Sequence, residues 1–98
     1  MRVVFADASR ADLRAITIFI AGDSPSRARS FVAELASACT SLADKPFRYP
    51  LIPEYETKGV RRRPYGNYAI IYTVGANTIT IARVLHAAMD VDVALGGS

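Results

Sequence analysis

The sequence has a single cysteine and a single histidine, and these small numbers exclude several kinds of site. One cysteine, Cys39, cannot form a disulfide within the chain, and it cannot build a zinc site from cysteine ligands. Because Cys39 lies beside Ala38 and Leu42 in a segment of helical periodicity, we expect a buried structural thiol. We accordingly expect neither a metal site nor a cofactor.

Long apolar runs are also absent from the sequence. No stretch approaches the ~18 consecutive apolar residues that a membrane-crossing helix needs. The N-terminal stretch, MRVVFADASR, lacks the long apolar run and the cleavage signature of a secretory signal peptide. We therefore expect a soluble, cytoplasmic domain with no membrane partner.

The size and composition indicate one small folded domain. The 98 residues suffice for a single core, and an apolar fraction of 51% is too high for a disordered chain. A net charge of +3 is mildly basic and hints at an acidic partner, although such a charge also favours solubility. We predict a single domain over residues 1–98, with a partly flexible tail over residues 87–98 that frays at Gly96-Gly97-Ser98.

Two helices are predicted in the first half of the chain. Ser9 and Asp12 resemble a capping box at the start of the first helix, and Gly22 ends it in a left-handed turn. Ser24-Pro25 opens the second helix, because serine caps helices and proline fits the first position. The second helix has an apolar face formed by Ala28, Phe31, Val32, Leu35, Cys39 and Leu42. The short connection predicts an antiparallel helical hairpin.

One strand is predicted before this hairpin and three after it. The predicted strands span residues 2–6, 59–63, 68–74 and 78–86. Between hairpin and strands, residues 45–58 contain three prolines and predict an ordered loop or edge segment. We expect its apolar side chains to pack on the core, namely Phe47, Tyr49, Leu51 and Ile52.

The element order is therefore β-α-α-β-β-β. This order predicts an α+β domain in which the helical hairpin packs on one face of a small antiparallel sheet. The other face of the sheet must then meet solvent, a ligand or a partner.

This order, together with three short pieces of sequence, resembles the ParE branch of the ParE/RelE toxin superfamily. The pieces are Arg61-Arg62 before a turn, Tyr68-Ala69-Ile70-Ile71-Tyr72 in the middle strand, and Arg83-Val84-Leu85-His86 closing the last strand. The resemblance covers nearly the whole chain. It implies a toxin of a bacterial type II toxin–antitoxin module with a small curved antiparallel sheet flanked by a helical hairpin.

The resemblance also implies partners. ParE-type toxins inhibit DNA gyrase, and a cognate antitoxin wraps them with its C-terminal segment. RelE-type toxins on the same fold cleave mRNA in the ribosome, so the fold alone does not fix the target. We predict a gyrase inhibitor that forms a hetero-oligomer with an antitoxin and does not bind nucleic acid directly. The alternatives are a ribosome-dependent endoribonuclease and an interaction module without toxicity.

The endoribonuclease alternative needs a base, a cation that holds the phosphate, and an acid. Glu54 or Glu56 could be the base. His86 could be the acid, because histidine titrates near neutral pH. The candidates for the phosphate-holding cation are Arg61, Arg62, Arg63 and Arg83. The catalytic set under this alternative is Glu56, Arg61, Arg83 and His86, whereas the ParE reading expects no catalytic residue.

Structural roles for these residues are favoured. Arg83 is expected to pair with a carboxylate on the same sheet face, and His86 with a backbone group or with Asp90 or Asp92. Glu54 and Glu56 lie on a loop, where carboxylates are usually solvated. The middle strand YAIIYTV lacks the basic residues of RelE-type nucleases, and alanines follow the histidine where those nucleases carry tyrosine.

A basic cluster precedes the turn, namely Lys58-Gly59-Val60-Arg61-Arg62-Arg63. It is expected to meet an acidic antitoxin segment or to protect a sheet edge. Tyr65, in the turn, is expected to be exposed, whereas Tyr68 and Tyr72 are expected in the core. The predicted antitoxin- or target-binding residues are Arg61, Arg62, Arg63, Tyr65, Arg83 and His86.

Overall fold

The computed structural model describes residues 1–96, and the predicted frayed end at Gly97 and Ser98 lies outside them. Its main elements are β1 (Arg2–Phe5), α1 (Asp7–Ala21), α2 (Pro25–Thr40), β2 (Val60–Tyr65), β3 (Tyr68–Val74) and β4 (Thr78–His86). Three short helical turns complete it, namely η1 (Ser41–Ala43), η2 (Glu56–Lys58) and α3 (Val91–Ala94). The helical turn α3 was not predicted. A single domain with a flexible tail over residues 87–98 stays a prediction.

The four strands form one sheet in the order β1-β4-β3-β2. Strands β2, β3 and β4 are antiparallel neighbours, joined by the turns at Gly66-Asn67 and Gly75-Ala76-Asn77. Strand β1 pairs parallel to β4, so the sheet is mixed and not wholly antiparallel as predicted. Parallel neighbours need a long crossover connection, and here the helical hairpin, β2 and β3 provide it. The predicted fold class, α+β with this element order, is confirmed.

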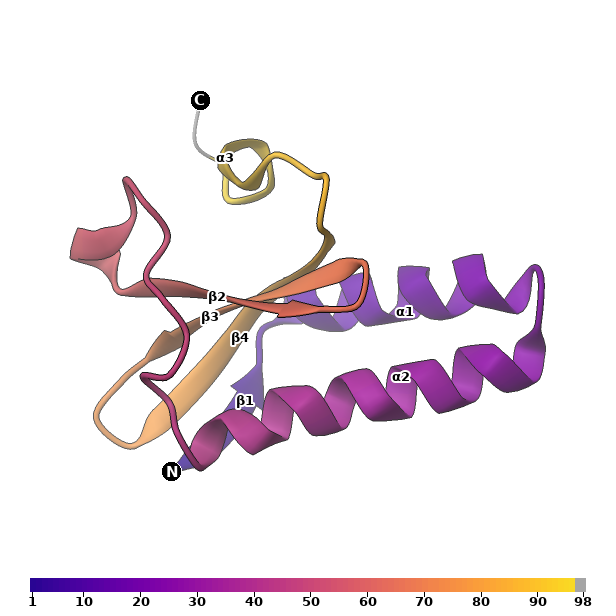
Figure 1. The fold of residues 1–98 in the computed structure, drawn as a ribbon, viewed down its shortest axis with the longest axis horizontal. Helices are drawn as coiled ribbons and strands as arrows, with labels where there is room; N and C mark the ends of the chain where they lie inside the picture. Colours follow the sequence, from indigo (N-terminus) through magenta and orange to yellow (C-terminus); the bar gives the residue numbers. More distant parts are fainter. Residues whose placement is uncertain (97–98) are drawn as a thin grey trace.

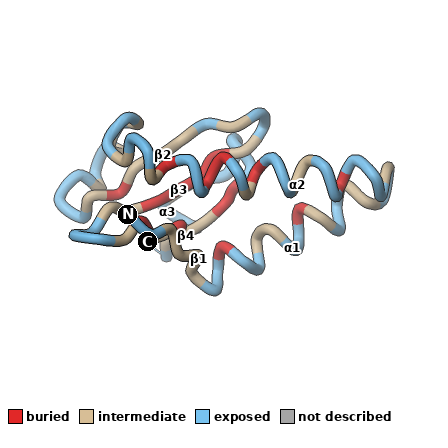
Figure 2. Tube along the Cα trace, turned by 90° about the horizontal axis from the view of Figure 1, so that it is seen from below, coloured by how far each residue is buried: buried red, intermediate tan, exposed pale blue. Residues whose placement is uncertain are grey.

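The helical hairpin covers one face of the sheet and makes the main core with it. Helices α1 and α2 run antiparallel beside each other (Figure 1). Leu35 and Cys39 of α2 and Leu42 of η1 are 0 to 2% exposed, and they belong to one cluster with Ile70, Tyr72, Ile79 and Ile81 of the sheet. Figure 2 shows buried residues on the strands and at intervals along both helices. Ser24 caps α2 as predicted, since its hydroxyl accepts a hydrogen bond from the Arg27 amide at 3.2 Å.

The start and end of α1 differ from the prediction. The helix begins at Asp7, and Ser9 donates its hydroxyl proton to the carbonyl of Ala6 at 2.7 Å instead of capping. Asp12 does not complete the predicted capping box, because its carboxylate accepts a hydrogen bond from Arg83. Gly22 does follow the last helical residue, but its φ of −57° is right-handed, so the predicted left-handed ending is wrong. No helix within residues 1–96 is long and apolar enough to cross a membrane.

The buried thiol of Cys39 gives a direct test of the main core. Burial raises the pKa of the Cys39 thiol to about 12. Because the thiolate is the reactive form, we expect native protein at about pH 8 to resist a disulfide reagent that labels the unfolded chain at once. Labelling can be followed by absorbance with and without denaturant. Equal labelling rates in the two conditions would place Cys39 at the surface and contradict this core.

The opposite sheet face carries a smaller second core. Val60, Ala69, Ile71 and Leu85 are buried there. The covering residues come from the proline-rich loop and from α3, namely Ile52, Tyr55, Ala94 and Leu95. The loop also forms a bridge between Leu51 and Arg61, which agrees with the predicted edge segment. This face is therefore covered largely by the chain itself.

A hydrogen bond joins the two covering segments. Tyr55 donates its phenol proton to Asp92 at 2.6 Å, and this bond raises the pKa of the Tyr55 phenol above its usual value. Asp90 caps α3 by accepting from the amide of Asp92 at 2.9 Å. Segment 90–96 therefore folds back on the sheet.

Candidate functional site

The three arginines of β2 point alternately to the two sheet faces. Arg61 lies on the face of the hairpin, where its Nη1 donates to the carbonyl of Tyr49 at 2.6 Å and its guanidinium lies 5.1 Å from the ring centre of Phe47. Arg62 lies on the other face and donates to the carbonyl of Ala87 at 3.3 Å. Phe47 is 64% exposed, so its predicted packing in the core is wrong, and it forms a cation–π contact instead.

Arg63 ties β2 to the end of α2. Its Nη1 donates to the carbonyl of Ala38 and, at 2.9 Å, to the hydroxyl of Ser41. These acceptors lie at the C-terminus of α2, where a cation is favoured by the helix dipole. Its guanidinium also lies 5.2 Å from the ring centre of Tyr49. Within the described residues, the buried Nε of Arg63 has no hydrogen-bond partner.

Arg83 and Asp12 form a two-pronged ion pair between β4 and α1. Nε and Nη2 of Arg83 donate to the two carboxylate oxygens of Asp12 at 2.7 and 2.8 Å. Asp12 also accepts from the amide of Val84 at 2.9 Å, beyond the point where β1 stops pairing with β4. The remaining Nη1 of Arg83 donates to the carbonyl of Ala94 at 2.7 Å. The predicted carboxylate partner is therefore confirmed, but it comes from a helix and not from the sheet.

The ion pair between Arg83 and Asp12 links α1 to the part of β4 that does not pair with β1. The side chains are only 25% exposed for Arg83 and 14% for Asp12. The hydrogen bond that Arg83 donates to Asp12 raises the pKa of Arg83 further above its usual value. The guanidinium is therefore fixed as a cation that joins α1, β4 and α3.

His86 ends β4 at the surface. Its Nδ1 accepts a hydrogen bond from the amide of Ala88 at 3.2 Å, so the expected backbone partner is found and neither Asp90 nor Asp92 bonds to it. Its ring meets Tyr68 edge to face, with centroids 5.7 Å apart.

The tyrosines depart from the predictions at Tyr65 and in part at Tyr68, which is half-buried at the margin of the main core. Tyr65 is half-buried, not exposed, because its ring packs against Phe31 of α2 with centroids 6.1 Å apart. Tyr72 is fully buried as predicted, and burial raises the pKa of its phenol. Glu54 and Glu56 are exposed, as expected of loop carboxylates.

The groups proposed for RNA cleavage do not gather at one point. Tyr65, Tyr68 and His86 form one row across the sheet, whereas Arg61 lies four residues along β2, about 13 Å away at the usual strand rise. Arg83 and His86 are three residues apart on β4, so their side chains leave on opposite faces. Glu56 precedes β2, at the end away from His86. Within residues 1–96, no three His, Cys, Asp or Glu side chains are placed to bind a metal ion.

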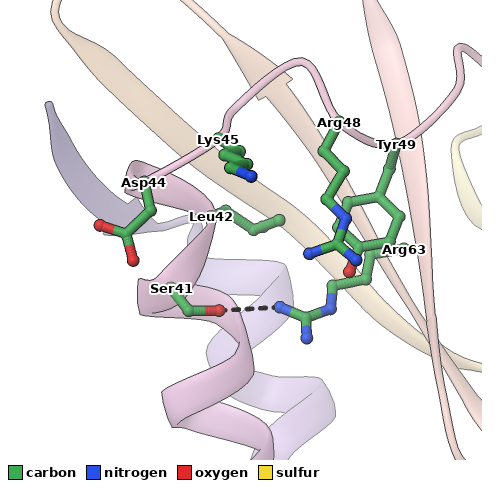
Figure 3. Close-up of a pocket in the computed structure, with 7 residues that line it drawn as sticks. All are labelled: Ser41, Leu42, Asp44, Lys45, Arg48, Tyr49 and Arg63. Carbon is green, nitrogen blue, oxygen red and sulfur yellow. Dashed lines mark hydrogen bonds between the residues drawn. The ribbon is translucent and has the colours of Figure 1, made fainter.

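A pocket that the sequence analysis missed lies beside Arg63. It has a volume of about 220 Å³ and opens between the end of α2, the following loop and β2 (Figure 3). It is lined by Ser41, Leu42, Asp44, Lys45, Arg48, Tyr49 and Arg63, and we call it the cationic pocket. Only the spread of basic residues on both sides of Pro46 could have drawn attention to it.

Comparison with known proteins identifies the family. The family model described as ParE toxin of type II toxin–antitoxin system, parDE, matches residues 3–91. The chain belongs to the ParE toxin family. No curated protein matches the sequence.

Solved structures with the ParE-family fold include two toxin–antitoxin systems. A chain from the chromosomal ParDE system of P. aeruginosa is 21% identical with a TM-score of 0.74, over 88% of this chain and 95% of that one. A chain of the RelBE2 toxin–antitoxin complex from Mycobacterium tuberculosis is 24% identical with a TM-score of 0.66, over 87% and 95%. At these identities the likeness shows the fold alone.

The ParE-family chain also exposes an apolar groove along α1. Two cavities of about 450 and 200 Å³ share Phe19 and Tyr68, and we call them together the α1 groove. Its other lining residues are Asp12, Ala15, Ile16, Ile20, Arg27, Phe31, Gly66, Asn67, Val84, Leu85, His86 and Met89. Phe19 is 76% exposed, and its neighbour Ile18 is 74% exposed. Such a contiguous apolar surface is typical of a protein-binding site.

Proposed function

We propose that this chain is a toxin that inhibits DNA gyrase in the cytoplasm and is neutralised by a cognate antitoxin in a hetero-oligomer. The observation that carries the proposal is membership of the ParE family over residues 3–91. The similar solved structures belong to a ParDE system and to a toxin–antitoxin complex, which supports an antitoxin as partner. The proposed mechanism is binding to the target, not bond cleavage.

The placement of the polar residues supports this mechanism over RNA cleavage. Arg83 makes hydrogen bonds with Asp12 and Ala94, which leaves it poorly placed to hold a phosphate. His86 stands about 13 Å along the sheet from the row of Arg61. A general acid and a phosphate-holding cation must both lie within hydrogen-bond reach of one scissile group. These positions therefore favour structural or partner-binding roles.

The proposal is tested with purified gyrase. We expect the protein to inhibit supercoiling of relaxed plasmid and to leave trapped DNA breaks after denaturation of the enzyme. A reaction with the topoisomerase omitted controls for direct action on DNA. If gyrase remains fully active at a large excess of protein, the proposal fails, and cleavage of mRNA on translating ribosomes becomes the next assay. Harmless expression of the chain without any partner would favour an interaction module.

The antitoxin is proposed to cover the α1 groove and to continue beside the β2 arginines. A disordered antitoxin segment that folds on the toxin must bury apolar surface, and Phe19 offers the largest exposed apolar side chain of the hairpin. The site proposed from the sequence alone, Arg61, Arg62, Arg63, Tyr65, Arg83 and His86, lies partly in this region. Arg61, Arg63 and Arg83 make internal hydrogen bonds, so charge reversal there would also disturb the fold.

Phe19→Ala is therefore the cleaner test of the antitoxin interface. We expect it to weaken antitoxin binding about tenfold or more, because buried aromatic anchors dominate such interfaces. Binding can be measured by calorimetry, and thermal unfolding of the free toxin should hardly change. Arg29→Ala, at an exposed position of α2, is the control. Unchanged affinity for the Phe19 variant would remove the α1 groove from the interface.

A further inference from the structure

The cationic pocket holds three positive side chains that form no ion pair within residues 1–96. Lys45, Arg48 and Arg63 all line it. In Figure 3 their nitrogen atoms lie around the pocket, and the carboxylate of Asp44 points away from the two arginines. Within residues 1–96 the ion pairs are Arg27–Glu34 and Arg83–Asp12, and neither involves this pocket. The pocket therefore has more positive than negative side chains, and none of the three cations is paired with a carboxylate of the described residues.

The two arginines both contact the aromatic ring of Tyr49. The guanidinium carbons of Arg48 and Arg63 lie 5.6 and 5.2 Å from the ring centre of Tyr49. Arg63 is fixed by its Nη1 hydrogen bond to Ser41, while its buried Nε has no partner within the described residues. Like charges that line one pocket repel each other, and a bound anion would add attraction to each of them. Arg63 is thus held in place by α2, while the side chains of Arg48 and Lys45 have no hydrogen-bond acceptor within the described residues.

We propose that the cationic pocket binds the carboxylate of an acidic side chain from a partner protein. An arginine fork binds a carboxylate with two parallel hydrogen bonds, and the ammonium of Lys45 adds a third donor group. The inference rests on the proposed function only for the identity of the partner, an antitoxin. Binding of an acidic peptide is a property of this chain by itself.

The shape of the pocket favours a protein side chain over a nucleic acid. A volume of about 220 Å³ suits a single side chain, whereas a nucleic acid strand needs a continuous basic path. The walls include Leu42 and Tyr49, which suit the methylene groups of a glutamate. Arg62 points to the other face of the sheet, so the arginines of β2 do not extend the pocket into a continuous basic path.

The test is an NMR titration of the full chain labelled with ¹⁵N. The probes are the blocked peptides Ac-Leu-Glu-Leu-NH2 and Ac-Leu-Gln-Leu-NH2 and a single-stranded oligothymidylate. We expect about tenfold tighter binding of the glutamate peptide than of the glutamine peptide, because hydrogen bonds to a charged group are stronger than neutral ones. The largest shifts should fall on the signals of Arg48, Arg63 and Lys45.

Charge-neutralising variants assign the effect to the pocket. Lys45 and Arg48 are exposed, and their side chains make no hydrogen bond within residues 1–96, so Lys45→Gln combined with Arg48→Gln should leave the fold and the backbone bond between them intact. The preference for glutamate should disappear in this double variant and persist in Arg29→Gln. Equal binding of the two peptides, binding of neither, or tighter binding of the oligothymidylate would each overturn the inference. A glutamate preference without gyrase inhibition would leave the pocket established and count against the proposed function alone.

Discussion

Asp12→Ala is expected to lower the free energy of unfolding by about 2–3 kcal/mol, somewhat less than the loss of a partner from a fully buried ion pair. The variant leaves the guanidinium of Arg83 and the amide of Val84 without their acceptor at the edge of β4. A loss of this size corresponds to a fall of Tm of about 10–20 °C for a domain of this length. Thermal unfolding followed by circular dichroism measures it.

An exposed ion pair in the same protein provides the control. Glu34 and Arg27 lie 2.7 Å apart, but their side chains are 48% and 54% exposed. Exposed pairs contribute about 0–1 kcal/mol, so Glu34→Ala should shift Tm only slightly. If the two alanine variants unfold at the same temperature, Asp12 does not hold α1 to β4 in the way described.

Leu35→Ala is expected to have a still larger effect, about 3–4 kcal/mol. Leu35 is fully buried in the middle of α2 and packs in the cluster between the hairpin and the sheet. Truncation removes apolar contacts and leaves a cavity that the rigid sheet behind it cannot fill. Urea unfolding gives the free energy of unfolding directly.

The matched control is Ile18→Ala on the exposed face of the hairpin. Its side chain is 74% exposed, so we expect a change within about 0.5 kcal/mol. A small effect of Leu35→Ala, similar to that of Ile18→Ala, would show that the hairpin does not pack on the sheet through this face of α2.

The elements with strong local signals were predictable from the sequence. Ser24-Pro25 marked the start of α2, and the helical spacing of its apolar residues marked the side that packs on the sheet. The alternation in residues 68–74 and 78–86 gave β3 and β4 with the observed bounds. These signals are local because caps, turns and periodicity act over a few residues.

Contacts between distant residues were not predictable in the same way. Asp12 and Arg83 are 71 positions apart in the sequence. The sequence around Asp12 is equally compatible with a capping box, and only the tertiary structure shows that Asp12 pairs with Arg83. The parallel pairing of β1 depends on how the hairpin crosses the sheet, which no residue of β1 reveals. Tyr65 looked exposed because its packing partner, Phe31, lies on another element.

In the candidate site, too, the residue types were predictable from the sequence, whereas the contacts between distant residues were not. The arginines of β2 were visible as a cluster in the sequence, but their alternation between faces divides them among three different sets of partners. The cationic pocket combines one of them with Lys45 and Arg48 from a loop rich in proline, a combination that only the fold creates. Function on a widely shared fold has to be argued from such placements.

The most direct test of a binding mechanism compares wild type with His86→Ala in the gyrase supercoiling assay. His86 is exposed at the end of β4, so its truncation should leave the fold intact, which circular dichroism can verify. We expect both proteins to inhibit gyrase and to trap breaks, because neither activity requires His86 as an acid. If neither protein affects gyrase while wild type, but not the variant, cleaves mRNA on ribosomes, the chain acts by chemistry and the present account is wrong.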